Sequence, residues 1–166
     1  MNDKKDITTS LYGHQIILVS EAAELVVSVS GALDAVLLAD QKLQVLEPPL
    51  SEIVLPTFGI YVGNIIGDDE NCVLFDTDDG KRRILTVDTI SKKVSGTGDS
   101  EQIGVAERFR IVMVGEKLCV IFSVSEQAWL SVDIDNNLDP DGRTFGIYAN
   151  KKTVDSSCLF TFVVIS

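Results

Sequence analysis

Side chains branched at Cβ dominate this sequence and constrain its fold more than any other feature. The chain of 166 residues holds 20 Val, 15 Ile and 10 Thr but only 8 Ala. Branching at Cβ restricts a side chain in a helix and packs well on a pleated strand, so the composition favours sheet over helix. No Gly-, Pro- or Ser-rich linker divides the chain, and its length suits one domain. We therefore predict a polar tail over residues 1–10 and a single all-β domain over residues 11–166.

Short β-rich runs recur every 10 to 15 residues from Thr57 onward, and turn pairs such as Asp141-Gly142 separate them. This spacing is typical of an antiparallel β-sandwich. In one run apolar side chains alternate with Arg108 and Arg110, so we expect the arginines outside or against an acidic neighbour. The predicted strands cover residues 57–66, 72–77, 82–88, 108–114, 117–124, 128–134, 144–150 and 158–165.

The first third of the chain is less regular. Residues 11–19 and 24–31 have the composition of strands, whereas residues 32–47 fit both a strand pattern and one short helix. We favour strands there. The prolines at 48, 49 and 56 limit residues 50–55 to an edge strand or a loop.

A series of motifs runs through residues 57–166. It comprises the aromatic-glycine segment FGIYVG at 58–63, CVLFDTDDGKRR, the hairpin RFRIVMVGEKLCVIFSV, Ala128-Trp129-Leu130 and GRTFGIYA at 142–149. In order and spacing this segment resembles the concanavalin A-like lectin/glucanase superfamily, whose jelly-roll sandwich also occurs in laminin G-like modules. The resemblance implies a jelly-roll fold. It leaves the function open, because that sandwich serves sugar binding, hydrolysis, adhesion and scaffolding alike.

An enzymatic role is not expected. Glucanases of that superfamily carry a Glu-x-Asp-x-Glu strand, because a retaining glycosidase needs two carboxyl groups about 5 Å apart. Here Asp133-Ile134-Asp135 and Asp76-Thr77-Asp78 lack the flanking glutamates. The chain has one histidine, His14, and no Gly-x-Ser-x-Gly motif.

An acidic segment is the candidate metal site. Oxygen-bearing side chains alternate along it, at Asp133, Asp135, Asn137, Asp139 and Asp141. Such side chains are ligands for calcium, but an EF-hand loop starting at Asn137 would need a bidentate glutamate where Tyr148 stands. Because Pro140 and Gly142 already explain a turn here, we expect no cofactor and keep calcium as the alternative.

Aromatic rings beside amides are the candidate glycan site, since sugar C–H faces stack on rings while the hydroxyls need fixed partners. The candidate residues are Trp129, Tyr61, Tyr148, Asn136, Asn137 and Asn150. The alternative is that Trp129, between Ala128 and Leu130, belongs to the core.

Charge, apolar stretches and cysteine usage limit the classes of partner and the environment that we expect for this protein. The formal net charge of −11 repels phosphate backbones, which argues against nucleic acid. No apolar stretch is long enough to span a membrane, and the polar N-terminus MNDKKDITTS lacks the apolar region of a secretion signal. The odd, widely spaced Cys72, Cys119 and Cys158 are expected to be buried, reduced thiols.

Two hypotheses about function remain. In the first, the protein is a non-enzymatic structural or interaction module that acts by surface contact within a larger assembly, such as a decoration or tail-associated component of a virus or phage particle. Its partner is then another protein or further copies of itself. In the second, it is a carbohydrate-binding, lectin-like module. We favour the first, because one tryptophan and three tyrosines form a small aromatic surface for a lectin.

Overall fold

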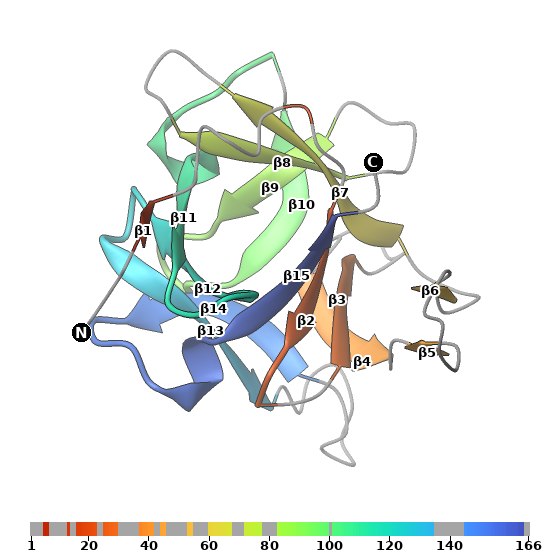
Figure 1. The fold of residues 1–166 in the computed structure, drawn as a ribbon. Coiled ribbons are helices and arrows are strands. Elements are labelled where there is room, and N and C mark those ends of the chain that lie inside the picture. The colour runs from red at the N-terminus through yellow and green to blue at the C-terminus, as the bar shows by residue number, and fades with distance from the viewer. Residues whose placement is uncertain are drawn as a thin grey trace.

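The protein is built almost entirely from antiparallel strands (Figure 1). A computed structural model describes residues 5–6, 13, 16–22, 25–29, 37–41, 44–45, 53–54, 60–67, 72–77, 83–99, 101–134 and 145–164. Within them every strand pairing is antiparallel, and helix is limited to two 3-10 turns, η2 (Val105–Glu107) and η3 (Ser156–Cys158). The predicted all-β antiparallel class is confirmed.

The longer strands fall into three consecutive units of four. The first unit contains β2 (Ile16–Ser20), β3 (Leu25–Val29), β4 (Leu37–Gln41) and β7 (Ile60–Gly67). The second contains β8 (Val73–Thr77), β9 (Arg83–Val87), β10 (Val94–Asp99) and β11 (Phe109–Met113). The third contains β12 (Leu118–Ser123), β13 (Ala128–Ile134), β14 (Phe145–Lys151) and β15 (Phe160–Val164).

One pairing scheme recurs in all three units. The first strand pairs with the second, the second with the third as a hairpin, and the fourth with the first strand of the next unit. Pairing can be followed from β2 through β3, β7, β8, β11, β12 and β15 back to β2, so the sheet closes into a ring. A closed ring with three hairpins is the arrangement called a β-trefoil. This strand order differs from the jelly-roll order expected from the sequence, in which two Greek keys form two packed sheets, because here each unit pairs with the next one along the chain.

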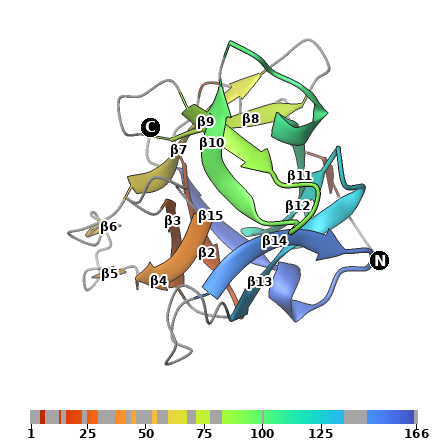
Figure 2. The same cartoon turned by 180° about the vertical axis from the view of Figure 1, so that it is seen from behind.

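The three hairpins meet one another. Strand β14 pairs with β4 through Phe145↔Ala39 and Gly146↔Leu38, and Lys93, just before β10, forms a bridge with Tyr148 of β14. Figure 2 shows β4, β10 and β14 next to one another. The hairpins therefore contact each other as well as the ring.

Apolar side chains of all three units form the core. The largest fully buried ones are Phe109, Phe160, Ile84, Leu85, Ile111, Ile121 and Ile147. Burial of each contributes on the order of 1.5–3 kcal/mol to folding. Residues Cys119, Val120 and Ile121 of β12 are all buried, so the protein itself covers most of a strand that is apolar on both faces.

The first third of the chain forms strands where it is described. Residues 37–41 and 44–45, for which strand and helix competed, are strands β4 and β5 (Gln44–Val45). Strand β5 pairs with β6 (Ile53–Val54) in a separate two-stranded sheet, which agrees with the edge or loop expected for residues 50–55. Part of the predicted polar tail forms β1 (Lys5–Asp6), which pairs with β11.

Strand β10 was not among the strands predicted from the sequence. Its sequence, VSGTGD, contains two glycines, which are rare inside strands. The register steps from Ser95↔Thr86 to Gly98↔Ile84, so β10 bulges against β9. A glycine at such a bulge is a place where another backbone approaches closely.

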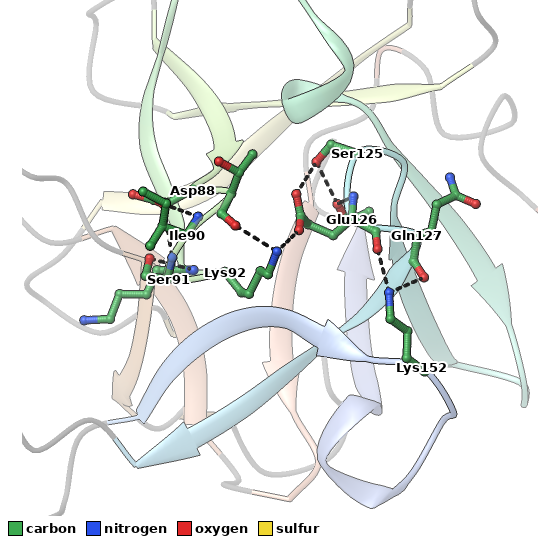
Figure 3. Close-up of polar contacts among 11 residues, drawn as sticks. Asp88, Ile90, Ser91, Lys92, Ser125, Glu126, Gln127 and Lys152 are labelled. Carbon is green, nitrogen blue, oxygen red and sulfur yellow. Dashed lines mark hydrogen bonds and ion pairs between the residues drawn. The ribbon is translucent and has the colours of Figure 1, made fainter.

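The turn between β9 and β10 is tied to the third unit (Figure 3). Lys92, in the left-handed region at φ 66°, donates from Nζ to the carbonyl of Thr89 (2.8 Å) and forms an ion pair with the largely buried carboxylate of Glu126. Lys152 donates to the Glu126 carbonyl at 2.9 Å. These contacts fix the hairpin of one unit against the β12–β13 turn of the next.

Replacing Gly98 by alanine should destabilise the fold. A Cβ at this position would lie 2.8 Å from the carbonyl oxygen of Ile84 and 3.0 Å from its side chain, so backbone must move. We expect Gly98→Ala to lower the free energy of unfolding by about 1–3 kcal/mol. The matched control is Gly115→Ala, whose Cβ would make only an ordinary contact with Leu118 at 3.4 Å. Urea unfolding of both variants measures the difference, and equal stability would contradict the close approach.

Candidate functional site

Four side chains form a row across neighbouring strands of the third unit and β11. Arg110 of β11 lies opposite Phe122 of β12, Phe122 lies opposite Trp129 of β13, and Trp129 lies opposite Lys151 of β14. Directly opposite residues in an antiparallel pair share one face of the sheet. The rings of Phe122 and Trp129 meet edge to face, with centroids 5.0 Å apart and an interplanar angle of 66°. We call Arg110, Phe122, Trp129 and Lys151 the cross-strand row.

Both cations of the cross-strand row are paired with carboxylates. Arg110 donates to Asp6 Oδ2 from Nε (2.8 Å) and Nη2 (2.6 Å), and the carboxylate raises the pKa of the guanidinium. Lys151 Nζ lies 3.2 Å from Asp155 Oδ2. The expectation that Arg108 and Arg110 face outward or an acidic neighbour therefore holds for Arg110. The row has charged groups at its ends but little net charge.

An apolar hollow of about 480 Å³ lies at the Arg110 end of the row. Its lining residues are Cys72, Val105, Arg108, Arg110, Phe122, Val124 and Gln127. Val105 is 55% exposed, and Ile103, two residues earlier, is 37% exposed. Exposed apolar side chains thus continue the hollow along the chain.

A polar hollow of about 310 Å³ lies at the Lys151 end, between β13, β14 and η3. Its lining residues are Ser131, Val132, Asp133, Asn150, Lys151, Asp155, Ser156 and Ser157. They offer hydroxyl, amide, carboxylate and ammonium groups within one small space.

A β-bulge directs Asn150 into the polar hollow. The register steps from Trp129↔Lys151 to Leu130↔Ala149, which leaves Asn150 as the extra residue of β14. The buried hydroxyl of Ser131 donates to Asn150 Oδ1 at 2.7 Å. Bulges of this kind re-aim side chains and are frequent beside functional sites.

Asp155 caps η3 at the rim of the polar hollow. Its carboxylate accepts hydrogen bonds from the backbone N–H of Ser157 (2.9 Å) and from the Ser157 hydroxyl. The Ser157 hydroxyl and Lys151 together lower the pKa of Asp155 to about 2. The side chain therefore stays a fixed acceptor at neutral pH.

In the second unit, a side chain occupies the place that corresponds to the polar hollow of the third unit. Its turn η2 contacts β9 as η3 contacts β13. The last residue of η2 is Glu107, a largely buried carboxylate that accepts hydrogen bonds from the hydroxyl of Thr86 (2.5 Å) and from the N–H of Gly104 (2.8 Å). The last residue of η3 is the smaller Cys158. A long side chain packs on β9, whereas the third unit has a polar hollow beside β13.

The structure brings part of the predicted glycan set together. Trp129 is a half-buried member of the cross-strand row, and Asn150 lines the polar hollow next to it. Tyr148 lines neither hollow, because its ring lies over Gly146, within 3.0–3.2 Å of where a Cβ would be. Tyr61 is described only as backbone of β7, and Asn136 and Asn137 lie outside the described residues.

The predicted metal set is mostly outside the described part of the chain. Asp133 is exposed and lines the polar hollow, whereas Asp135, Asn137, Asp139 and Asp141 are not described. The described residues contain no group of three or more His, Cys, Asp or Glu side chains that could hold a metal ion.

The cysteines behave as predicted. Cys72, Cys119 and Cys158 are free and buried, and burial raises the pKa of the Cys119 thiol to about 12. Among the described segments, no helix has the length and apolar character needed to cross a membrane.

Sequence analysis missed Ser131, Lys151, Asp155 and the pairing of Arg110 with Phe122. Only Asp155 carried a local signal, since an aspartate before two serines is typical of a residue that caps a turn. The others depend on which strand lies beside which.

No model of a known protein family matches the chain, and no curated protein sequence matches it. Solved structures do resemble it. One is a Caenorhabditis elegans protein with unknown function from structural genomics, with a TM-score of 0.62 at 8% identity over 92% of this chain and 94% of that one. Another is the SDF2-like protein from Arabidopsis thaliana, with a TM-score of 0.60 at 10% identity over 96% and 94%. At this identity the likeness shows a shared strand-rich fold. It does not support the concanavalin A-like superfamily.

Asp155 should make stability depend on pH. Its folded pKa of about 2 lies below the ordinary value of 3.8, so its contribution is present above about pH 4 and is lost as the pH falls towards 2. We expect wild type to be more stable than Asp155→Asn at pH 5, and this gap to shrink as the pH is lowered. Urea unfolding at several pH values measures it, with the exposed Thr153→Ala as a control that shows no such trend. A gap independent of pH would contradict the assignment.

Proposed function

We propose that this protein is a non-enzymatic interaction module that acts by surface contact between copies of itself within a larger assembly, such as a virus or phage particle. The cross-strand row is the observation that carries the proposal. It places Arg110, Phe122 and Trp129 side by side on one face, next to the apolar hollow. Arginine and aromatic side chains are enriched in the parts of interfaces that contribute most binding energy.

Exposed apolar residues support the same face. Val105 lines the apolar hollow and is more than half exposed, although most of the apolar side chains whose burial the structure describes are covered. Contact with a second copy would bury Val105 together with Phe122.

Charge supports a second copy as the partner. The chain carries a net charge of −11, so two copies repel each other across most of their surfaces. In the cross-strand row, however, Arg110 is paired with Asp6 and Lys151 with Asp155. A face with little net charge is where copies of an acidic protein approach with the least repulsion.

Two groups with shifted pKa values are poorly suited to catalysis, which supports the non-enzymatic proposal. A general acid or base works best with a pKa near the working pH, but hydrogen bonds hold the pKa of Asp155 near 2. The Cys119 thiol is buried and protonated at neutral pH.

Carbohydrate binding is the second candidate, and the polar hollow favours it. Trp129, Ser131 and Asp133 alternate with Ala128, Leu130 and Val132, so the first three share one face of β13. An aromatic ring thus lies beside the hydroxyl, amide and carboxylate groups of the hollow. This combination suits a sugar, which presents both a C–H face and hydroxyls.

A carboxylate at Val105 should weaken self-association. We expect Val105→Asp to raise the dissociation constant of the wild-type oligomer at least about tenfold, because it places an unpaired charge in the contact. The matched control is Ile90→Asp. Ile90 is 92% exposed but lines neither hollow, so general loss of surface apolarity would affect both variants alike.

Light scattering after size exclusion, over a range of concentrations, measures this difference. At a protein concentration of about 1 mM, even a contact with a dissociation constant of about 1 mM is substantially populated. A wild-type protein that stays monomeric at this concentration overturns the proposal. Equal effects of Val105→Asp and Ile90→Asp remove the assignment to this face.

The carbohydrate hypothesis predicts a different result on a glycan array. If a defined oligosaccharide binds, Asn150→Ala should lower its affinity at least about tenfold, because a site built on buried hydrogen bonds loses more than one contact. Trp129→Ala should do the same by removing the stacking surface. The control is Thr153→Ala, which is exposed outside the hollow, and thermal melts verify folding. Binding that is unchanged in all three variants would place the sugar elsewhere.

A further inference from the structure

The N-terminal strand β1 lies on a strand far from it in the sequence (Figure 1). Lys5 pairs with Met113 and Asp6 with Val112, both in β11. On that side of β11, the described part of the ring strand β8 pairs through Phe109↔Val73, at the opposite end. Strand β1 therefore pairs with a part of this edge that the described part of β8 does not reach, and an open strand edge is a template for an added strand.

The described contacts of β1 lie near the surface. Among the described residues, β1 attaches to β11 through two ladder residues and the Asp6–Arg110 ion pair, whose side chains are 39% and 36% exposed. An ion pair with this exposure contributes little to stability. Segments held by few backbone hydrogen bonds can open locally without unfolding the rest of a protein.

Together these observations support an exchange. We propose that β1 is exchanged between copies of this chain, so that Asp6 of one copy binds Arg110 of another. This inference rests on the proposed self-association and says which contact joins the copies. Exchange of an identical element makes the same contacts between copies as within one, and is therefore a low-cost route to dimers.

The connecting segment is long enough for exchange. Nine residues, 7–15, separate β1 from β2, and a chain of that length spans up to about 30 Å. That reach is comparable to the diameter of a small domain.

The position of Arg110 explains what exchange would gain. Arg110 belongs to the cross-strand row and lines the apolar hollow with Val105 and Phe122. Strand β1 is the exchanged arm. Binding of the arm of a second copy to β11 brings that copy next to this hollow. The exchanged dimer keeps every contact of the closed monomer and also buries apolar surface, which favours it as concentration rises.

A charge-reversal pair tests the exchange. In Asp6→Arg two arginines face each other, and in Arg110→Asp two carboxylates do, whether the arm binds within a copy or between identical copies. In a mixture of the two variants, the arginine introduced at position 6 of one variant can pair with the aspartate introduced at position 110 of the other, and Asp6 of the second with Arg110 of the first. Opposite charges therefore meet only between different variants. We expect each variant alone to associate more weakly than wild type and the equimolar mixture to form mainly the heterodimer, seen by light scattering and by native mass spectrometry with one variant isotope-labelled.

The double variant Asp6→Arg/Arg110→Asp is the matched control, because it restores opposite charges in one chain and should associate like wild type. Two monomers in the mixture would overturn the exchange. If Val105→Asp still abolishes wild-type association in that case, the proposed function stands and only the arm is wrong. If wild type never associates but the mixture forms heterodimers, the exchange stands and the proposed face fails.

Discussion

Pairing between β15 and β2 is the contact on which the rest of this structure depends, because it closes the ring of strands. The two strands pair along their length, from Phe160↔Ser20 to Val164↔Ile16. Closure gives hydrogen-bond partners to backbone groups that an open sheet would expose at its edges. It also encloses core residues such as Phe109 and Phe160. The candidate face follows from the same closure, since β12 is held between β11 and β15 at its start. At its end, β12 carries Phe122 between β11 and β13.

Repetition of one four-stranded scheme lets equivalent positions diverge. The second unit packs the carboxylate of Glu107 against Thr86, whereas the third ends its 3-10 turn with Cys158 and has a polar hollow beside β13. Both 3-10 turns precede a ring strand. The backbone therefore follows the same path in the second and third units, while the side chains differ. Among the described residues, the third unit therefore gathers polar groups beside Trp129, from the bulge at Asn150 and the cap at Asp155.

Most strands were predictable because their cause is local. The alternation of Phe109 and Ile111 with two arginines marks β11, and both apolar side chains are buried as expected. Strand β10 was not predicted because Gly96 and Gly98 lower its strand propensity. It forms a strand through its pairing with β9, which the local sequence does not show. At the candidate site, Trp129 and Asn150 were recognisable by residue type. Lys151 and Ser131 were not, because their roles depend on the register between β13 and β14.

The sequence by itself determined the all-β class, most strand positions and the burial of the three thiols, because β-branching and apolar alternation act over a few residues. Only the tertiary structure decided that the strands close into a ring by one scheme used three times, a repeat that no similarity in sequence reveals. It alone set Arg110, Phe122, Trp129 and Lys151 in one row and brought Asp6 to Arg110. The physical reason is that cross-strand contacts join residues that are distant in the chain, and their register is set by the packing of the whole sheet.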